Sequence, residues 1–68
     1  MNQTTFQSPI MTVKQVADYL QMKESTIYAW TQSRKIPAIK IGRTWRFWRD
    51  DIVAWLKKQT IKTADDES

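Results

Sequence analysis

The 68-residue sequence contains no cysteine and no histidine, only one glycine and only two prolines. These absences exclude disulfide bonds and the usual zinc sites. They also remove the common nucleophile–base pairs, so the sequence predicts a protein that is not an enzyme and has no cofactor or metal. No apolar run approaches the roughly 18 residues of a membrane helix, and no signal-peptide pattern opens the chain, so we expect a cytoplasmic protein that has no membrane partner.

A chain of this length is expected to form one small domain, which buries only about 60% of its unfolded surface. Four tryptophans, two tyrosines and two phenylalanines supply much of the apolar area available to its core. We expect residues 11–60 to form the ordered domain. Residues 1–10 are expected to be a flexible N-terminal arm, and residues 61–68 a disordered acidic tail.

Positive charge is concentrated in the middle of the chain. The net charge is +4, but residues 23–49 hold seven basic side chains and one acidic one, for a local charge of +6. Residues 1–22 are neutral, and residues 50–68 carry −2. This distribution is typical of a protein with a polyanionic partner.

Two helices with a short connection are predicted in the first half of the chain. Thr12 and Gln15 have the spacing of a capping box, and apolar residues follow at helical spacing. A three-residue link at residues 21–23 leads to a second helix over about residues 24–33. This arrangement is typical of a helix-turn-helix, whose second helix enters the major groove of DNA.

A β-hairpin is predicted over residues 35–47, with its turn at residues 42–44 around the only glycine. Apolar and cationic side chains alternate along it, which predicts one apolar and one cationic face. The apolar face comprises Ile39, Ile41, Trp45 and Phe47, and the cationic face comprises Lys40 and Arg46. A two-residue loop would mix the faces, so we expect a three-residue loop that pairs Ile41 with Trp45.

A third helix is predicted from about residues 49–50. It has two acidic residues in its first turn and two lysines in its last, which suits the helix dipole at both ends. Its apolar stripe of Ile52, Trp55 and Leu56 is expected to close the core. Trp48, just before this helix, either shields the start of the helix or is exposed as a contact point for protein or DNA, and the sequence leaves both alternatives open.

Four sequence blocks resemble the excisionase-type winged helix-turn-helix domains, which are related to the N-terminal module of MerR regulators. The blocks are residues 12–20, 25–28, 35–47 and 50–56, in the order in which they occur along the chain. The resemblance implies a mainly α, MerR-like fold of two helices, a small β-hairpin and a third helix. It also implies that the hairpin is a wing that contacts the DNA backbone or minor groove.

The resemblance implies DNA contacts from both the second helix and the wing. Helix contacts would come from Lys23, Ser25, Thr26 and Tyr28, with Arg34 and Lys35 as further candidates at its end, and wing contacts from Lys40, Arg43 and Arg46. Arg43, at the hairpin tip, is the strongest single candidate, because an arginine there can reach phosphates or a narrow minor groove. The aromatic residues of the apolar stripes are expected to be core.

Three positions depart from the family pattern. Gln21 stands where the family usually has glycine, and Lys23 stands where it usually has a serine cap. Losing that cap removes a hydrogen bond worth about 1 kcal/mol. Ala29 occupies a position that is often basic in the family, so we expect the second helix to contact fewer base edges.

The resemblance implies an excisionase, or recombination directionality factor, of a mobile element, which bends double-stranded DNA and assists an integrase. A small transcriptional regulator of the same fold is the alternative. A protein-interaction module that recruits a recombinase or polymerase is the alternative from another class. We expect a bacterial or phage-encoded, nucleoid-associated monomer without a small-molecule effector that binds DNA cooperatively.

Overall fold

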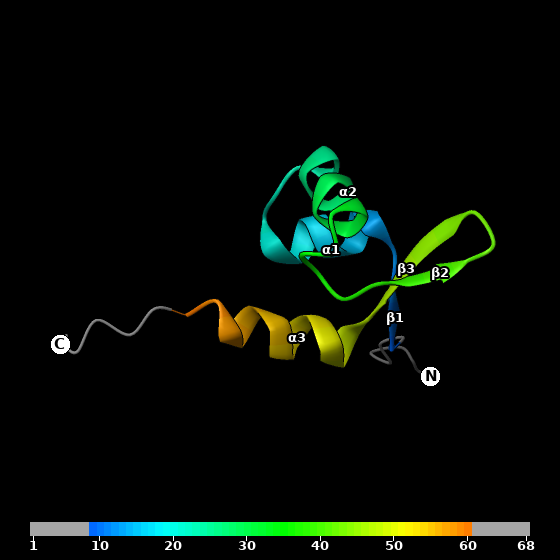
Figure 1. The fold of residues 1–68 in the computed structure, drawn as a ribbon. Coiled ribbons are helices and arrows are strands. Elements are labelled where there is room, and N and C mark those ends of the chain that lie inside the picture. Colours follow the sequence, from blue (N-terminus) through cyan, green and yellow to red (C-terminus); the bar gives the residue numbers. More distant parts are fainter. Residues whose placement is uncertain (1–8, 61–68) are drawn as a thin grey trace, which may run out of the picture.

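The computed structural model describes residues 9–60, and its fold is that of a small winged helix-turn-helix (Figure 1). The elements in chain order are β1 (Ile10–Met11), α1 (Val13–Leu20), α2 (Glu24–Gln32), β2 (Ile39–Ile41), β3 (Thr44–Trp48) and α3 (Arg49–Lys58). The two helices, the hairpin and the third helix follow one another as predicted. Residues 1–8 and the acidic tail lie outside the described residues, so the predictions for them stay open.

Strand β1 was not predicted, because two residues are too few to show a strand period, and Ile10 was instead expected to belong to the flexible arm of residues 1–10. It pairs antiparallel with β3, with Ile10 opposite Trp48 and Met11 opposite Phe47, so the sheet order is β1-β3-β2. The backbone N–H of Arg49 also donates to the carbonyl of Pro9 at 2.8 Å. The chain before α1 is therefore attached to the junction of β3 and α3.

Helix α1 begins with the predicted capping box. The hydroxyl of Thr12 accepts from the Gln15 N–H at 3.1 Å, and the Gln15 side-chain oxygen accepts from the Thr12 N–H at 2.9 Å. Helix α2 has no side-chain cap, since its N-cap residue is Lys23. The start of α1 is thus fixed by side chains, whereas α2 depends on packing and on its C-terminal end.

Both α1 and α2 end in the same backbone motif. Gln21 has a φ of 59° and Arg34 a φ of 61°, the left-handed conformation in which glycine is usual. After α1, Met22 N–H bonds to the Ala17 carbonyl at 2.8 Å; after α2, Lys35 N–H bonds to the Trp30 carbonyl at 2.8 Å. These are Schellman caps built without glycine, so each carries a cost in backbone strain.

The predicted hairpin register is wrong. The turn has two residues, Gly42 and Arg43, and it pairs Ile41 with Thr44 and Ile39 with Arg46. Gly42 has a φ of 60°, whereas Arg43 does not have a positive φ, as in a type II′ turn with glycine first. This turn matches the twist of the strands, and it determines the register.

The assignment of residues to hairpin faces is wrong for the same reason. Residues paired directly across an antiparallel ladder share a face, so Lys40 lies beside Trp45 and on the side of the buried Phe47. The Lys40 ammonium stands 4.6 Å from the centre of the Trp45 ring. Ile39 and Ile41 lie on the opposite face with Arg46. Each face therefore carries both apolar and basic residues.

The core lies between α1, α2, β3 and α3. Its fully buried members are Val16, Ile27, Phe47 and Ile52, joined by the nearly buried Val13, Ala17 and Ile36. Trp30, Trp45 and Trp55 pack against this cluster and are partly exposed. Trp48 is 47% exposed, which removes the alternative of a buried packing role.

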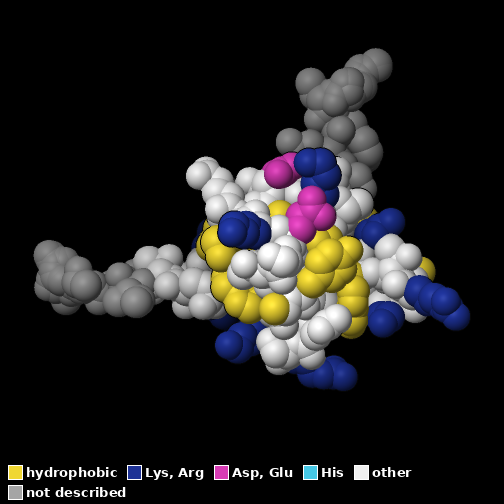
Figure 2. Space-filling view, turned by 90° about the horizontal axis from the view of Figure 1, so that it is seen from above, with side chains coloured by type: hydrophobic (Ala, Val, Ile, Leu, Met, Phe, Trp, Pro, Cys, Tyr) yellow, Lys and Arg dark blue, Asp and Glu magenta, His cyan; other side chains and the backbone are white. Residues whose placement is uncertain are grey.

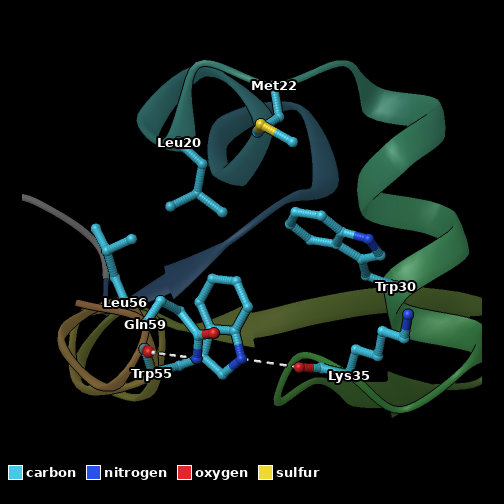
Figure 3. Close-up of a pocket in the computed structure, with 7 residues that line it drawn as sticks. All are labelled: Leu20, Met22, Trp30, Lys35, Trp55, Leu56 and Gln59. Carbon is cyan, nitrogen blue, oxygen red and sulfur yellow. Dashed lines mark hydrogen bonds between the residues drawn. The ribbon is translucent and has the colours of Figure 1, made fainter. Parts of the chain in front are cut away.

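The tryptophan of α3 joins this helix to α2 and to the chain that follows α2 (Figure 3). The indole N–H of Trp55 donates to the Lys35 carbonyl at 2.8 Å, and its ring centre is 5.9 Å from that of Trp30. Leu56 is 40% exposed, so the predicted apolar stripe of α3 closes the core only through Ile52 and Trp55. Of the helices in residues 9–60, none combines the length and apolarity needed to cross a membrane.

Candidate nucleic-acid interface

The outward side of α2 is the first component of the candidate interface. Ser25, Tyr28, Ala29 and Gln32 are all exposed and lie at helical spacing, while Ile27 and Thr31 are buried on the other side. Thr26 is half-buried at the edge of this stripe. Of the three predicted polar contacts on α2, Ser25 and Tyr28 are therefore presented to solvent and Thr26 only in part.

The contacts of the inner side and of the C-terminal end of α2 position the exposed residues of this helix. The hydroxyl of Thr31 is buried and donates to the Ile27 carbonyl at 2.7 Å, so its polar group is satisfied within the helix. Beyond the C-terminus of α2, Trp55 binds the Lys35 carbonyl as described above. Helix α2 therefore packs against α1 and is connected at its C-terminal end to α3.

The hairpin is the second component, and it projects from the body of the molecule (Figure 1). A shallow pocket of about 320 Å³ lies between the hairpin and the N-terminal parts of α1 and α2. Its lining includes Tyr28 from α2 and Arg43 and Arg46 from the hairpin. The structure thus brings together predicted contacts of the helix and of the wing that are 15 or more residues apart in the sequence.

A second hollow, of about 890 Å³, collects other predicted cations. Arg34, Lys35 and Lys40 line it together with Gln32. Trp45 lines both hollows, whereas the basic residues of the two hollows differ. The predicted site is therefore divided into one part near the hairpin tip and one part near the end of α2.

The basic candidates differ in how available their charge is. Arg46 is half-buried and donates from its guanidinium to the Trp45 carbonyl at 2.8 Å. The Lys40 ammonium lies over the Trp45 ring, and Arg43 is exposed at the turn. The ion pairs within residues 9–60 join Lys14 to Asp18 and Arg49 to Asp50, and none involves a predicted basic contact.

Two polar residues near the site were not among the predicted DNA contacts. Gln32 lies four residues after Tyr28 on the exposed stripe, and this helical spacing was the signal available for it. Lys14, in α1, lines the same pocket as Arg43, although its ammonium is 3.6 Å from Asp18. Only the tertiary structure reveals the position of Lys14, since no residue of its helix was among the predicted DNA contacts.

Figure 2 views the molecule from above, from the side of α1 and α2. Lysine and arginine side chains surround a mainly apolar and neutral centre, and the projecting hairpin carries basic groups at its end. Acidic side chains also lie on this side, beside basic ones. On this face the basic side chains are therefore spread around a rim rather than collected in one patch.

Comparison with known proteins identifies the family. Residues 10–60 match the family described as "Helix-turn-helix domain". The chain belongs to this helix-turn-helix family. The match covers β1 through α3, so this helix-turn-helix protein carries the family's sequence pattern across all its described elements.

The helix-turn-helix protein also resembles a characterised regulator. It is 37% identical over 49 residues to the transcriptional repressor DcmR of Methylorubrum extorquens, a match that covers 69% of this chain. The matched region spans only 18% of the repressor's length. No solved structure matches the chain.

Proposed function

We propose that the protein binds double-stranded DNA sequence-specifically, with α2 in the major groove and the hairpin on the neighbouring backbone or minor groove. The observation that carries this proposal is the shared pocket of Tyr28, Arg43 and Arg46, which places the outer side of α2 and the hairpin tip together. The helix-turn-helix family supports it, because the second helix of this motif characteristically enters the major groove.

The residues of the interface would contact different parts of the DNA, according to the chemistry of their side chains. Ser25, Tyr28 and Gln32 can donate to base edges or phosphates from α2. Lys23, at the start of α2, is exposed and uses no side-chain atom for capping, so its ammonium is available for a phosphate. The cations around both hollows would neutralise the backbone on either side of the groove.

A biological role in gene regulation is favoured by the relative, which is a transcriptional repressor. A role as an excisionase that bends DNA and assists an integrase is favoured by the four sequence blocks described above. A genome-wide footprint in the host separates the two. Occupancy of promoters supports the regulator, and occupancy of short repeats beside an integrase gene supports the excisionase.

Selection from a pool of random duplexes tests the binding proposal directly. We expect one enriched site and an affinity for it that exceeds that for a shuffled duplex by about 10³-fold or more at physiological salt. Equal affinity for both duplexes would contradict sequence-specific binding. The shuffled duplex has the same length and composition, so it controls for the charge attraction shared by all DNA.

We further propose that the protein is a monomer in solution and binds cooperatively to neighbouring sites. One small module of this kind covers roughly 600–1,000 Å² of interface, which limits the affinity of a single copy. Sedimentation of the free protein, and of complexes with one or two copies of the selected site, measures both properties. A tight dimer without DNA would contradict this part of the proposal.

A further inference from the structure

The tip of the hairpin presents an apolar side chain that the described part of the chain leaves more than half exposed. Ile41 is 56% exposed and is the most exposed of the large hydrophobic residues in the structure. It directly precedes the turn, where a side chain added at Gly42 would meet no atom within 4 Å. The end of the hairpin is therefore a narrow projection surrounded by open space.

The two-residue turn explains why Ile41 points away from the core. It pairs Ile41 with Thr44, whereas the opposite face of the hairpin holds Lys40 and Trp45. Had the loop contained three residues, Ile41 would have shared a face with Trp45. A lone exposed isoleucine elsewhere on a surface would need no explanation. Here it stands at the end of a projecting basic element.

Arg43 accompanies this side chain at the tip. It is exposed, and it lines the pocket shared with Tyr28 on α2. The hairpin tip therefore lies beside α2, the helix that we assign to the major groove. A wing beside a major-groove helix lies over the next minor groove, where apolar wedges of other proteins separate base pairs and kink the duplex by roughly 20–90°.

The geometry points to Ile41 as such a wedge: the hairpin inserts it between two base pairs of the minor groove, with Arg43 on the adjacent phosphates or groove floor, and the DNA bends. This inference rests on the proposed function. It also predicts a sequence preference at the wing, because pyrimidine–purine steps such as TA and CA/TG unstack most easily. That preference requires no hydrogen bond to a base edge.

The test compares bending by the full-length protein and its variants on the selected duplex, measured by energy transfer between dyes at the two DNA ends. Ile41→Ala is expected to reduce the bend and weaken binding about tenfold, since an aliphatic contact is lost. Ile41→Leu keeps a wedge and should bend like the parent. Thr44→Ala is the matched control, because Thr44 is exposed and paired with Ile41 but is not apolar.

A second duplex with one mismatched base pair under the hairpin sharpens the test, because its step is already partly unstacked. Ile41→Ala should recover most of its lost affinity there. Equal bending by the parent and Ile41→Ala, or an unbent parent complex, would overturn the wedge and leave sequence-specific binding intact. A parent that does not prefer the selected duplex would overturn the proposed function, and the wedge with it.

Discussion

The indole nitrogen of Trp55 donates to the backbone carbonyl of Lys35 at 2.8 Å, which connects α3 to the segment that leaves α2 (Figure 3). Twenty residues separate the two partners in the sequence. The Lys35 N–H already closes the end of α2 by donating to Trp30. The backbone of Lys35 thus bonds to both helices, and the residue also lines the hollow that it shares with Arg34 and Lys40.

Replacing Trp55 by phenylalanine tests this connection. The variant keeps an aromatic ring but cannot donate, so we expect its unfolding free energy to fall by about 0.5–1.5 kcal/mol. Urea unfolding followed by circular dichroism measures the change. Trp48→Phe is the matched control, because Trp48 is half exposed and should shift stability by less than about 0.5 kcal/mol. Equal losses in the two variants would contradict the assigned role.

Gln21→Gly is expected to stabilise the protein. The left-handed backbone at Gln21 strains a side chain, and glycine relieves a strain of about 1–2 kcal/mol, less its own entropy cost in the unfolded chain. We therefore expect a net gain of about 0.5–1 kcal/mol, seen as a higher urea midpoint. DNA affinity should stay unchanged. A lower midpoint would show that the Gln21 side chain makes a stabilising contact.

Arg34→Gly is the informative counterpart, because Arg34 occupies the equivalent position after α2. We expect a similar gain in stability but weaker DNA binding, since a predicted phosphate contact is lost. Anisotropy titrations over a range of salt concentrations should show the slope of log K against log salt reduced by about 0.9. An unchanged slope would remove Arg34 from the interface while leaving its role in the cap intact.

Arg43→Ala should weaken DNA binding without affecting the fold. Its guanidinium is exposed at the turn, so circular dichroism should show parent-like unfolding. The salt slope should again fall by about 0.9 if one phosphate contact is lost. Lys58→Ala removes an equally exposed charge at the end of α3, far along the chain from the hairpin, and should bind like the parent. Equal losses from both changes would indicate a general charge effect.

Local signals predicted much of this fold. The capping box of Thr12 and Gln15, the short link before α2 and the charged ends of α3 each depend on neighbouring residues, and each is present in the structure. The absence of a side-chain cap at Lys23, the N-cap residue of α2, was also predicted from the sequence. The outer side of α2 followed from helical spacing, although Gln32 was not among the predicted DNA contacts.

Features that depend on distant partners could not be predicted. Strand β1 exists only because β3 lies beside it, and its two residues show no period of their own. The predicted register was wrong because it assumed one continuous apolar face on the hairpin. In the structure, Trp45 and Phe47 are the residues of β2 and β3 that belong to the core or pack against it, and the two-residue turn determines which residues pair. The proximity of Tyr28 to Arg43 likewise arises only once the hairpin folds back toward α2.

The central claim is that α2 and the hairpin form one DNA-binding surface, and amide chemical shifts of the isotope-labelled protein test it most directly. On addition of the selected duplex, we predict the largest shifts in residues 23–29 and 40–46, with small shifts at residues 54–59 of α3 and its end. Shifts concentrated instead around Trp55 and Leu56, or none at saturating DNA, would contradict the account. Either of those results would favour a module that binds protein at the hollow of about 540 Å³ beside α3, which Trp30, Trp55 and Leu56 help to line.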